Sequence, residues 1–242
     1  MTAAAATTAK SLAIICGVGE GFGAALASAF SAHHSCALLA RSKQKLDAIT
    51  AELCDSGADA AAFSCDVSSL ESVQSAFSGI KEKYPEHQLK AAIFNASSPF
   101  IMKPFLELQA TDLQPSIDVN INGAFHFSQQ VIPLLLEAGG GFLSFTGATA
   151  SFKGGAKFAA FAPGKFAVRA LSQSLAREFG PLGIHVSHSI VDGLIGQRGI
   201  TAEGDDTHLD PDAMAATILH LSEQPKTGWT YEIVLRPAKE RW

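Results

Sequence analysis

Short apolar runs alternate along the chain with longer segments in which apolar and polar residues recur at helical spacing. This alternation is typical of a parallel sheet that is covered by helices on both faces. The apolar runs predict strands near residues 11–16, 35–40, 60–65, 89–95, 141–146, 184–190 and 230–235. The amphipathic segments between them predict helices near residues 21–33, 43–55, 69–83, 112–138, 157–179 and 211–223. The sequence therefore predicts an α/β fold with one doubly wound, seven-stranded parallel sheet.

No linker, repeat or low-complexity block divides this pattern, and 242 residues are enough to bury one large core. We therefore expect residues 1–242 to form a single domain, with a flexible N-terminal segment over residues 1–10. One stretch, residues 193–210, holds four glycines and many polar groups without a clear period. It is too long for an ordinary connection between a strand and a helix. We interpret it as a mobile flap over a substrate site, with a surface loop that has no task as the alternative.

Charge and composition narrow the range of partners. The net charge is −5 and no run of lysine and arginine is present, so we expect no nucleic-acid partner. No segment reaches about 20 consecutive apolar residues, and we expect no membrane partner. Residues 1–10 lack the pattern of a targeting signal. The cysteines lie in or beside apolar runs without the spacing of a zinc site, which favours reduced thiols, no metal and a cytoplasmic protein.

A glycine-rich segment, Cys16 to Gly23, follows the first predicted strand directly and opens the first predicted helix. Gly17 would permit a tight turn, Gly21 would let the backbone approach a pyrophosphate, and Gly23 would bring the helix close to the strand. The N–H groups and the dipole at the start of the helix favour phosphate. The sequence thus predicts the dinucleotide site of a Rossmann fold, with a turn that binds no ligand as the alternative. The predicted cofactor contacts in this loop are Gly17, Gly19, Glu20, Gly21, Phe22 and Gly23.

The end of the second strand decides between the two nicotinamide dinucleotides. A carboxylate there would bind the ribose hydroxyls of NAD and repel the 2′-phosphate of NADP. Here Ala40 is followed by Arg41 and Ser42, and a guanidinium beside a hydroxyl suits a phosphomonoester. We therefore predict NADP(H) in preference to NAD(H), although an exposed arginine is common on loops. Asp66, directly after the third strand, would accept a hydrogen bond from the adenine amino group, unless it or Ser68 caps the next helix.

Three further motifs occur in order after these. Asn95-Ala96-Ser97 ends the fourth strand, Asn120 lies in a Val-Asn-Ile-Asn-Gly run, and Lys165 lies on the helix after the fifth strand. Together they resemble the short-chain dehydrogenase/reductase family from about residue 11 to the C-terminus. The resemblance implies a nicotinamide cofactor, hydride transfer to or from a carbonyl or alcohol, and an active site of Asn, Ser, Tyr and Lys. The further cofactor contacts that it implies are Val67, Asn95, Ala96, Ser97, Lys165, Gly193 and Ile195.

The chain departs from the family pattern where the chemistry occurs. Phe161 stands where the family has the tyrosine of its Tyr-x-x-x-Lys motif, so the ring has no hydroxyl to donate a proton. Lys165 is retained at a spacing of four residues and could still reach the nicotinamide ribose. The family's serine falls near Ala148, with Thr149 and Ser151 as nearby substitutes. The chain is similar to a subgroup that carries Phe and keeps the lysine.

The missing hydroxyl leaves three functions open. The first is an NADP(H)-dependent oxidoreductase acting on a carbonyl or alcohol of an apolar small molecule, with its proton from another group. That group would be Lys165 through a water, Thr149, Ser151, His188 or Asp192, each of which has an ordinary structural role as the alternative. The second is a non-redox enzyme on the same scaffold, namely an isomerase, lyase or cyclase. The third is a catalytically silent NADP(H)-binding protein or the partner subunit of an active relative.

These considerations give two sets of candidate residues for the reaction. The catalytic candidates are Asn120, Thr149, Ser151, Phe161 and Lys165. Asn120 would hold a water or a bend in its helix, with a plain place on the helix face as the alternative. The candidates for a substrate pocket are Phe100, Ala148, Phe152, His188, Asp192 and Leu194.

The family resemblance also implies self-association. Its members usually form a homodimer or homotetramer through the two long helices, here predicted near residues 112–138 and 157–179. Small residues are abundant over residues 158–176, which would permit close contact between helices. We therefore expect a homo-oligomer whose other partner is a small-molecule substrate.

Overall fold

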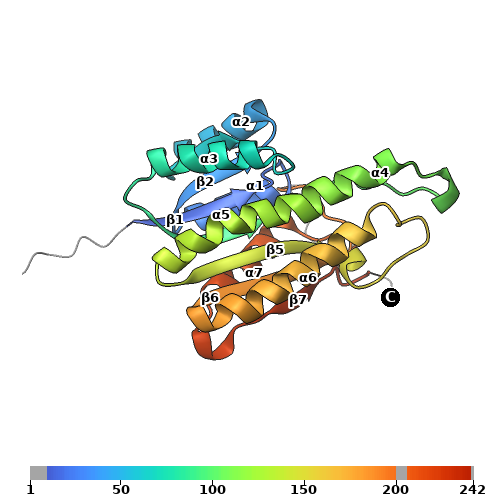
Figure 1. Ribbon diagram of the computed structural model, residues 1–242. Helices are drawn as coiled ribbons and strands as arrows, with labels where there is room; N and C mark the ends of the chain where they lie inside the picture. Colours follow the sequence, from blue (N-terminus) through green and yellow to red (C-terminus); the bar gives the residue numbers. More distant parts are fainter. Residues whose placement is uncertain (1–9, 200–205, 241–242) are drawn as a thin grey trace, which may run out of the picture.

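The computed structural model describes residues 10–199 and 206–240, and its strands form one parallel sheet (Figure 1). Seven strands lie in the order β3-β2-β1-β4-β5-β6-β7. They are β1 (Ser11–Cys16), β2 (Ser35–Ala40), β3 (Ala60–Ser64), β4 (Gln88–Phe94), β5 (Gly141–Ala148), β6 (Ile184–Val191) and β7 (Glu232–Leu235). The chain order reverses between β1 and β4, which is where a sheet of this kind opens a crevice at the carboxyl ends of its strands. The predicted fold is confirmed.

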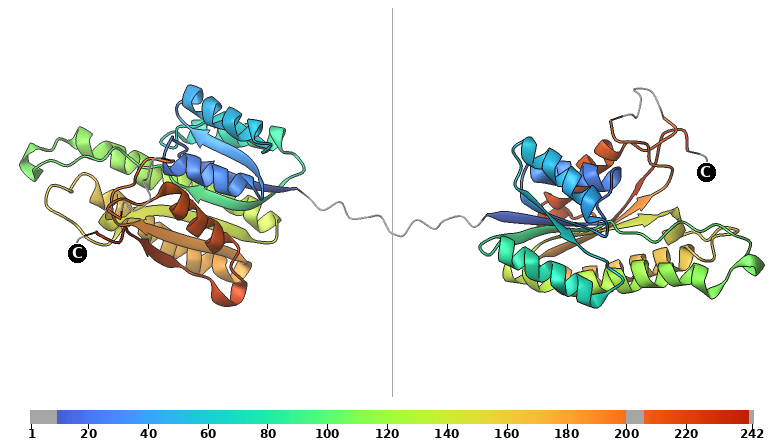
Figure 2. Two further views of the ribbon diagram at one scale, coloured as in Figure 1. Left: turned by 180° about the vertical axis from the view of Figure 1, so that it is seen from behind. Right: turned by 90° about the horizontal axis from the view of Figure 1, so that it is seen from above.

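Helices cover both faces of the sheet (Figure 2). They are α1 (Phe22–Ser31), α2 (Lys43–Asp55), α3 (Leu70–Lys83), α4 (Ala110–Pro115), α5 (Ala124–Glu137), α6 (Ala162–Phe179) and α7 (Pro211–Ser222). Helices α3, α5 and α6 pack on one face, and α1, α2 and α7 pack on the other. Every described part of the chain thus contributes to a single domain around one sheet. No helix within residues 10–199 and 206–240 is long and apolar enough to cross a bilayer.

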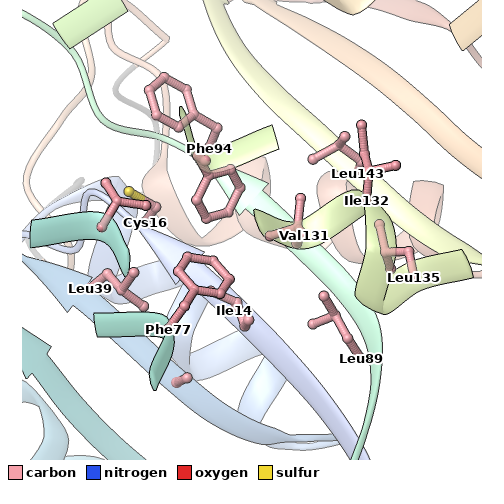
Figure 3. Packing of buried hydrophobic residues seen from close by; sticks show 14 of the residues in the cluster. Ile14, Cys16, Leu39, Phe77, Leu89, Phe94, Val131, Ile132, Leu135 and Leu143 are labelled. Carbon is pink, nitrogen blue, oxygen red and sulfur yellow. The ribbon is translucent and has the colours of Figure 1, made fainter. Parts of the chain in front are cut away.

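The core lies on both sides of β1, because successive side chains of a strand point to opposite faces. Ile14 packs with Phe94 and Val131 in the cluster beneath α3 and α5 (Figure 3). Its neighbour Ile15 belongs to the cluster beneath α1, α2 and α7. Ile14, Ile15 and Phe94 are fully buried. Each such side chain stabilises the fold by about 1.5–3 kcal/mol relative to an exposed position.

Two predicted helices differ from the observed ones. The helix predicted over residues 157–179 begins at Ala162, because Lys157 has a φ of 70° and lies in the left-handed region. Phe161 is the N-cap residue, and a proline follows in the first turn. The helix predicted over residues 112–138 is interrupted by a π-helical segment, Ser116–Gly123, between α4 and α5. Such segments are frequently found at functional sites, and this one contains Asn120.

The two segments expected to be mobile are only partly described. Of residues 1–10, the structure describes Lys10 alone, and of residues 193–210 it describes all but 200–205. The described ends of the second segment are joined, since Ile195 and Leu209 form a parallel bridge and Leu209 is buried. Its role as a flap stays a prediction.

Candidate functional site

A cleft of about 590 Å³ lies at the carboxyl ends of β1 to β4. It contains most of the predicted cofactor contacts, brought together from four segments of the chain: Gly17, Gly19, Arg41, Ser42, Asp66, Val67, Asn95, Ala96 and Ser97. The predicted cofactor contacts did not include the other lining residues, which flank the same motifs: Cys16, Val18, Ala40, Cys65, Pro99 and Val119. Of the remaining predicted contacts, Glu20 and Gly21 lie in the loop before α1, and Phe22 and Gly23 begin that helix.

The glycines of the loop serve two different purposes. Gly17 has a φ of +90°, and a Cβ there would lie 2.4 Å from the backbone nitrogen of Ala96. A Cβ at Gly23 would lie 2.7 Å from the carbonyl oxygen of Gly17. At Gly19 and Gly21, by contrast, a Cβ would meet no atom within 4 Å. Gly17 and Gly23 are therefore required by the fold, whereas Gly19 and Gly21 face open space.

The start of α1 is built to receive an anion. Its N-cap residue is Gly21, so no side chain accepts a hydrogen bond from the first turn. The first turn carries no acidic residue either. The N–H groups of this turn and the positive end of the helix dipole thus face the open space at Gly21, as in other phosphate-binding helices.

Asn95 holds the loop in place. Its side-chain nitrogen donates a hydrogen bond to the carbonyl oxygen of Gly17 at 3.0 Å, and its backbone nitrogen donates to the carbonyl oxygen of Cys16 at 2.8 Å. These bonds tie the end of β4 to the end of β1 across the point where the strand order reverses. The amide of Asn95 therefore fixes the shape of the cleft wall.

Three polar side chains line the far end of the cleft. Arg41 is exposed, and its guanidinium has no ion-pair partner among the described residues. Ser42 is the N-cap of α2, but its hydroxyl does not cap the helix and is free to bind a ligand. The Asp66 carboxylate accepts hydrogen bonds from Ser68, which lower the pKa of Asp66 together with the nearby charge of Arg41. The alternative that Asp66 or Ser68 caps α3 is wrong, because the N-cap is Ser69.

Asn120 is fully buried inside the π-helical segment. Its side-chain oxygen accepts a hydrogen bond from the backbone nitrogen of Ser98 at 3.1 Å, and its nitrogen donates to the Ser98 hydroxyl at 3.0 Å. The first turn of α6 packs closely against it, since a Cβ at Gly164 would lie 2.9 Å from the Asn120 nitrogen and 2.3 Å from the Ser116 hydroxyl. Asn120 thus joins the loop after β4 to the helix that carries Lys165.

Lys165 is a buried lysine, with 3% of its surface exposed. Its ammonium donates to the carbonyl oxygen of Thr146 at 3.1 Å and lies 5.9 Å from the centroid of the Phe161 ring. Burial lowers the pKa of Lys165 to about 8, because the charged form loses its hydration. Phe161 is buried too, and its ring meets the edge of the Phe100 ring at 5.1 Å between centroids.

The hydroxyl substitutes for the family's serine lie in a turn after Ala148. The buried Ser151 hydroxyl accepts a hydrogen bond from the backbone nitrogen of Ala148 at 3.1 Å, so it stabilises the turn. Thr149 instead donates its hydroxyl hydrogen to the carboxylate of Asp192. Arg236 lies 3.5 Å from the other oxygen of that carboxylate. The structure therefore joins Thr149 and Asp192, which sequence reasoning named separately.

His188 lies inside the sheet layer and is fully buried. Its Nδ1 atom is 2.9 Å from the Glu232 carboxylate, which also forms two hydrogen bonds of 2.7 Å with Arg169. Burial lowers the pKa of His188, and because the Glu232 carboxylate can only accept, Nδ1 is the donor in this bond. Its Nε2 atom packs against Gly147, where a Cβ would lie 2.3 Å away. Sequence reasoning missed Glu232, Arg169 and Gly147, although a glycine inside a strand signals such a close approach.

The predicted substrate residues are divided between surface and interior. The exposed fractions of Phe100, Phe152 and Leu194 are 58%, 42% and 70%. Phe100 lies against Phe158 at 5.3 Å between ring centroids. His188, by contrast, is fully buried. Among residues 10–199 and 206–240, no group of three histidine, cysteine, aspartate or glutamate side chains is arranged to hold a metal ion.

Comparison with known proteins gives a consistent result. The family model described as short chain dehydrogenase matches residues 11–217. An uncharacterised oxidoreductase of Staphylococcus aureus strain N315 is 26% identical over 230 residues, covering 93% of this chain and 96% of the relative. The crystal structure of a short-chain dehydrogenase from Rhodopseudomonas palustris is 31% identical with a TM-score of 0.82, covering 94% of this chain and 98% of that one. An alcohol dehydrogenase from the archaeon Thermococcus sibiricus, complexed with 5-hydroxy-NADP, shares the fold with a TM-score of 0.84 at 24% identity, covering 96% of this chain and 98% of that one.

Proposed function

The chain belongs to the short-chain dehydrogenase family, and from this premise we propose that it is an NADP(H)-dependent oxidoreductase for a carbonyl or alcohol group of an apolar small molecule. The observation that carries the proposal is the cleft at the carboxyl ends of β1 to β4. It combines open space at the start of α1 with an exposed guanidinium at the end of β2. The buried Lys165 lies at the start of the neighbouring α6.

The residues of the cleft fit a nicotinamide dinucleotide. The uncapped N–H groups at Gly21, Phe22 and Gly23 would hold the pyrophosphate, since no protein group occupies the space in front of Gly21. Asp66 and Val67 would receive the adenine. Further along, Lys165 would bind the nicotinamide ribose, and Gly193 and Ile195 would flank the nicotinamide. When bound, NADP(H) supplies or accepts the hydride.

The preference for NADP(H) rests on Arg41 and Ser42. A 2′-phosphate would form charge-assisted hydrogen bonds with the guanidinium of Arg41 and a further bond with the hydroxyl of Ser42. Neither group is used by another described part of the chain in an ion pair or a helix cap. The end of β2 carries Ala40 where a carboxylate would exclude the phosphate. The 5-hydroxy-NADP bound by the Thermococcus sibiricus enzyme agrees with this preference, although that similarity is one of fold.

The proposal of an apolar substrate rests on the predicted substrate residues, of which Phe100, Phe152 and Leu194 expose large apolar side chains. The Phe100 ring packs on Phe161, the ring next to the Lys165 ammonium. Ala148 and Phe161 replace the two hydroxyls with which the family binds a carbonyl oxygen. A substrate held at this place would therefore be positioned by apolar contact.

Lys165 would supply a positive charge and would orient the nicotinamide ribose. It would not act together with a tyrosine hydroxyl, as the family's lysine does, because Phe161 has none. The Lys165 ammonium donates a hydrogen bond to the Thr146 carbonyl oxygen. Burial lowers the pKa of Lys165 to about 8, which is close to neutral pH. A group with such a pKa exchanges protons readily under physiological conditions. Phe161 lies beside the ammonium but has no hydroxyl with which to transfer a proton.

We also propose that the protein is a homo-oligomer. Large apolar side chains are exposed along the outer helices: Ile121 in the π-helical segment, Phe125 on α5 and Phe166 on α6 have exposed fractions of 37%, 50% and 42%. Exposed apolar surface of this kind commonly marks a contact between proteins. Light scattering of the purified protein measures the mass of the particle, and a monomer at micromolar concentration would overturn this proposal.

The test of the proposed function follows the absorbance of the reduced nicotinamide. Purified protein is incubated with NADPH and a panel of apolar ketones and aldehydes, and with NADP⁺ and the corresponding alcohols. Substrate-dependent oxidation or reduction of the nucleotide is the expected result. If the nucleotide binds but no member of the panel is turned over, the redox assignment fails in favour of a non-redox enzyme or a silent binding protein.

A further inference from the structure

The carboxyl ends of β5, β6 and β7 carry a connected set of polar side chains. Thr149 follows β5, Asp192 follows β6 and Arg236 follows β7. Thr149 donates its hydroxyl hydrogen to one oxygen of the Asp192 carboxylate, and Arg236 lies 3.5 Å from the other. The backbone nitrogen of Asp192 donates to the carbonyl oxygen of Leu235 at 2.8 Å, which keeps the last two strand ends level. The set thus lies at the edge of the sheet where ligands of this fold bind.

Thr149, Asp192 and Arg236 are more exposed than Ser151 and His188, two other candidates for proton transfer that the sequence offers. The side chains of Asp192 and Arg236 are 16% and 17% exposed, and Thr149 is partly buried. Ser151 and His188 have no exposed surface. Thr149 is therefore a partly exposed residue whose hydroxyl bonds a carboxylate, whereas Ser151 and His188 are fully buried.

The direction of the hydrogen bond decides what this hydroxyl can do. Because a carboxylate can only accept and an arginine can only donate, Thr149 gives its hydrogen to Asp192 while Arg236 stabilises the ionised carboxylate. The lone pairs of the Thr149 oxygen then remain free for a second donor. The hydroxyl of an alcohol substrate is such a donor.

We propose that Thr149, backed by Asp192, is the base that takes the proton of an alcohol substrate in place of the missing tyrosine; this inference rests on the proposed function. The O–H bond of the substrate breaks and its proton passes to the Thr149 oxygen, while the hydrogen of Thr149 passes to Asp192. The carbinol C–H bond breaks at the same time, and its hydride passes to the oxidised nicotinamide nucleotide. The substrate carbon and oxygen are left as a carbonyl, and Asp192 is left protonated.

Arg236 has a positioning role in this arrangement. Its guanidinium lies 3.5 Å from the Asp192 oxygen that does not bond Thr149, and so helps to hold the carboxylate beside the threonine. The other charged groups at this end of the sheet include Lys165 at the start of α6 and Glu240, whose carboxylate would lie 3.1 Å from a Cβ at Gly193. They do not take part in the hydrogen bond between Thr149 and Asp192.

The test compares Thr149→Val, which removes the hydroxyl at nearly constant volume, with Thr149→Ser, which retains it. Thr217→Val is the matched control, because the Thr217 hydroxyl only bonds within α7. In the Val variant, kcat for alcohol oxidation is expected to fall at least about 10²-fold with the Kd for NADP⁺ unchanged. The Ser variant should stay within about tenfold of wild type.

A second readout needs no turnover. In a double-mutant cycle followed by urea unfolding, Thr149→Val and Asp192→Asn should together lose less stability than the sum of their separate losses, because both remove the same hydrogen bond. Thr217→Val combined with Asp192→Asn should give additive losses, since the Thr217 hydroxyl bonds within α7.

The outcomes distinguish failure of the Thr149–Asp192 base from failure of the proposed oxidoreductase function. Alcohol oxidation that survives Thr149→Val, or additive losses of stability in the cycle of Thr149→Val and Asp192→Asn, overturns the Thr149–Asp192 base and leaves the oxidoreductase in place. Absence of turnover in the wild-type protein, despite nucleotide binding, overturns the proposed function and this base together.

Discussion

The ammonium nitrogen of Lys165 lies 5.9 Å from the centroid of the Phe161 ring, so the lysine faces an aromatic ring that has no hydroxyl. At this distance the ring offers a cation a modest attraction and no proton. The lysine itself keeps its anchor on the Thr146 carbonyl. The residues predicted to bind a nucleotide are thus present, and a phenylalanine stands where the family resemblance places a tyrosine.

Burial of Lys165 destabilises the fold at neutral pH. Its pKa of about 8 lies below the usual 10.5, so between these values the folded chain binds fewer protons than the unfolded chain. The free energy of unfolding therefore rises with pH across this window, and the cost of burying the charge is fully present below pH 8. Lys165→Met should stabilise the protein at pH 7 by on the order of 1–3 kcal/mol and by much less at pH 10. Urea unfolding at both pH values measures the difference; equal stability of the two proteins at pH 7 would refute the prediction.

Gly21 and Gly17 should respond differently to the same substitution. A Cβ at Gly21 meets no atom of the chain, whereas one at Gly17 would lie 2.4 Å from the Ala96 nitrogen on a backbone with a φ of +90°. Gly21→Ala should therefore retain the fold and lose about tenfold or more in NADPH affinity. Gly17→Ala should lower the unfolding free energy by roughly 2–4 kcal/mol. Thermal unfolding and nucleotide titration of both variants separate these effects, and an unimpaired NADPH affinity in Gly21→Ala would place the pyrophosphate elsewhere.

Arg41 should discriminate between nucleotides without affecting the fold. Arg41→Ala removes the charge-assisted bonds to a 2′-phosphate, so NADPH affinity should fall by about 10- to 100-fold while NADH affinity stays the same. Arg177→Ala, which removes an exposed arginine of α6 far from the cleft, is the control for the loss of one positive charge. Equal losses for NADPH and NADH in the Arg41 variant would contradict a contact with the 2′-phosphate.

Gly147 and His188 should be coupled in stability. A Cβ at Gly147 would lie 2.3 Å from His188 Nε2, so Gly147→Ala should cost roughly 2–4 kcal/mol. In a His188→Ala background the Ser151 hydroxyl oxygen alone of the three nearest atoms stays, 2.9 Å from that Cβ, so the same substitution should cost about 1–2 kcal/mol less. Gly154→Ala, where a Cβ meets nothing within 4 Å, serves as the control. Urea unfolding of the four proteins of the cycle checks this, and additive losses would contradict the packing.

The sequence predicted features that depend on local order along the chain, and missed those that depend on contacts across it. The apolar runs located every strand of the sheet, and the glycine loop was recognised because it follows one strand and opens one helix. The start of α6 was placed five residues too early because helical periodicity carries no sign of the left-handed Lys157. The Glu232–His188 pair spans 44 residues, and no spacing rule predicts such a contact.

The candidate site shows the same division. Arg41 and Asp66 line the cleft and Lys165 lies on α6, while their roles toward a nucleotide stay predictions. The amides of Asn95 and Asn120, however, make their hydrogen bonds to the protein itself, which a residue type alone does not reveal. The bond between Thr149 and Asp192 arises because β5 and β6 end side by side, and strand register had to be seen to find it.

Isothermal titration calorimetry of the wild-type protein with NADPH and, separately, with NADH tests the nucleotide site most directly. We predict saturable binding of one NADPH per chain, with an affinity at least about tenfold above that for NADH. No saturable heat with either nucleotide up to about 1 mM would contradict the account, because the open space at the start of α1 would then have no dinucleotide to hold.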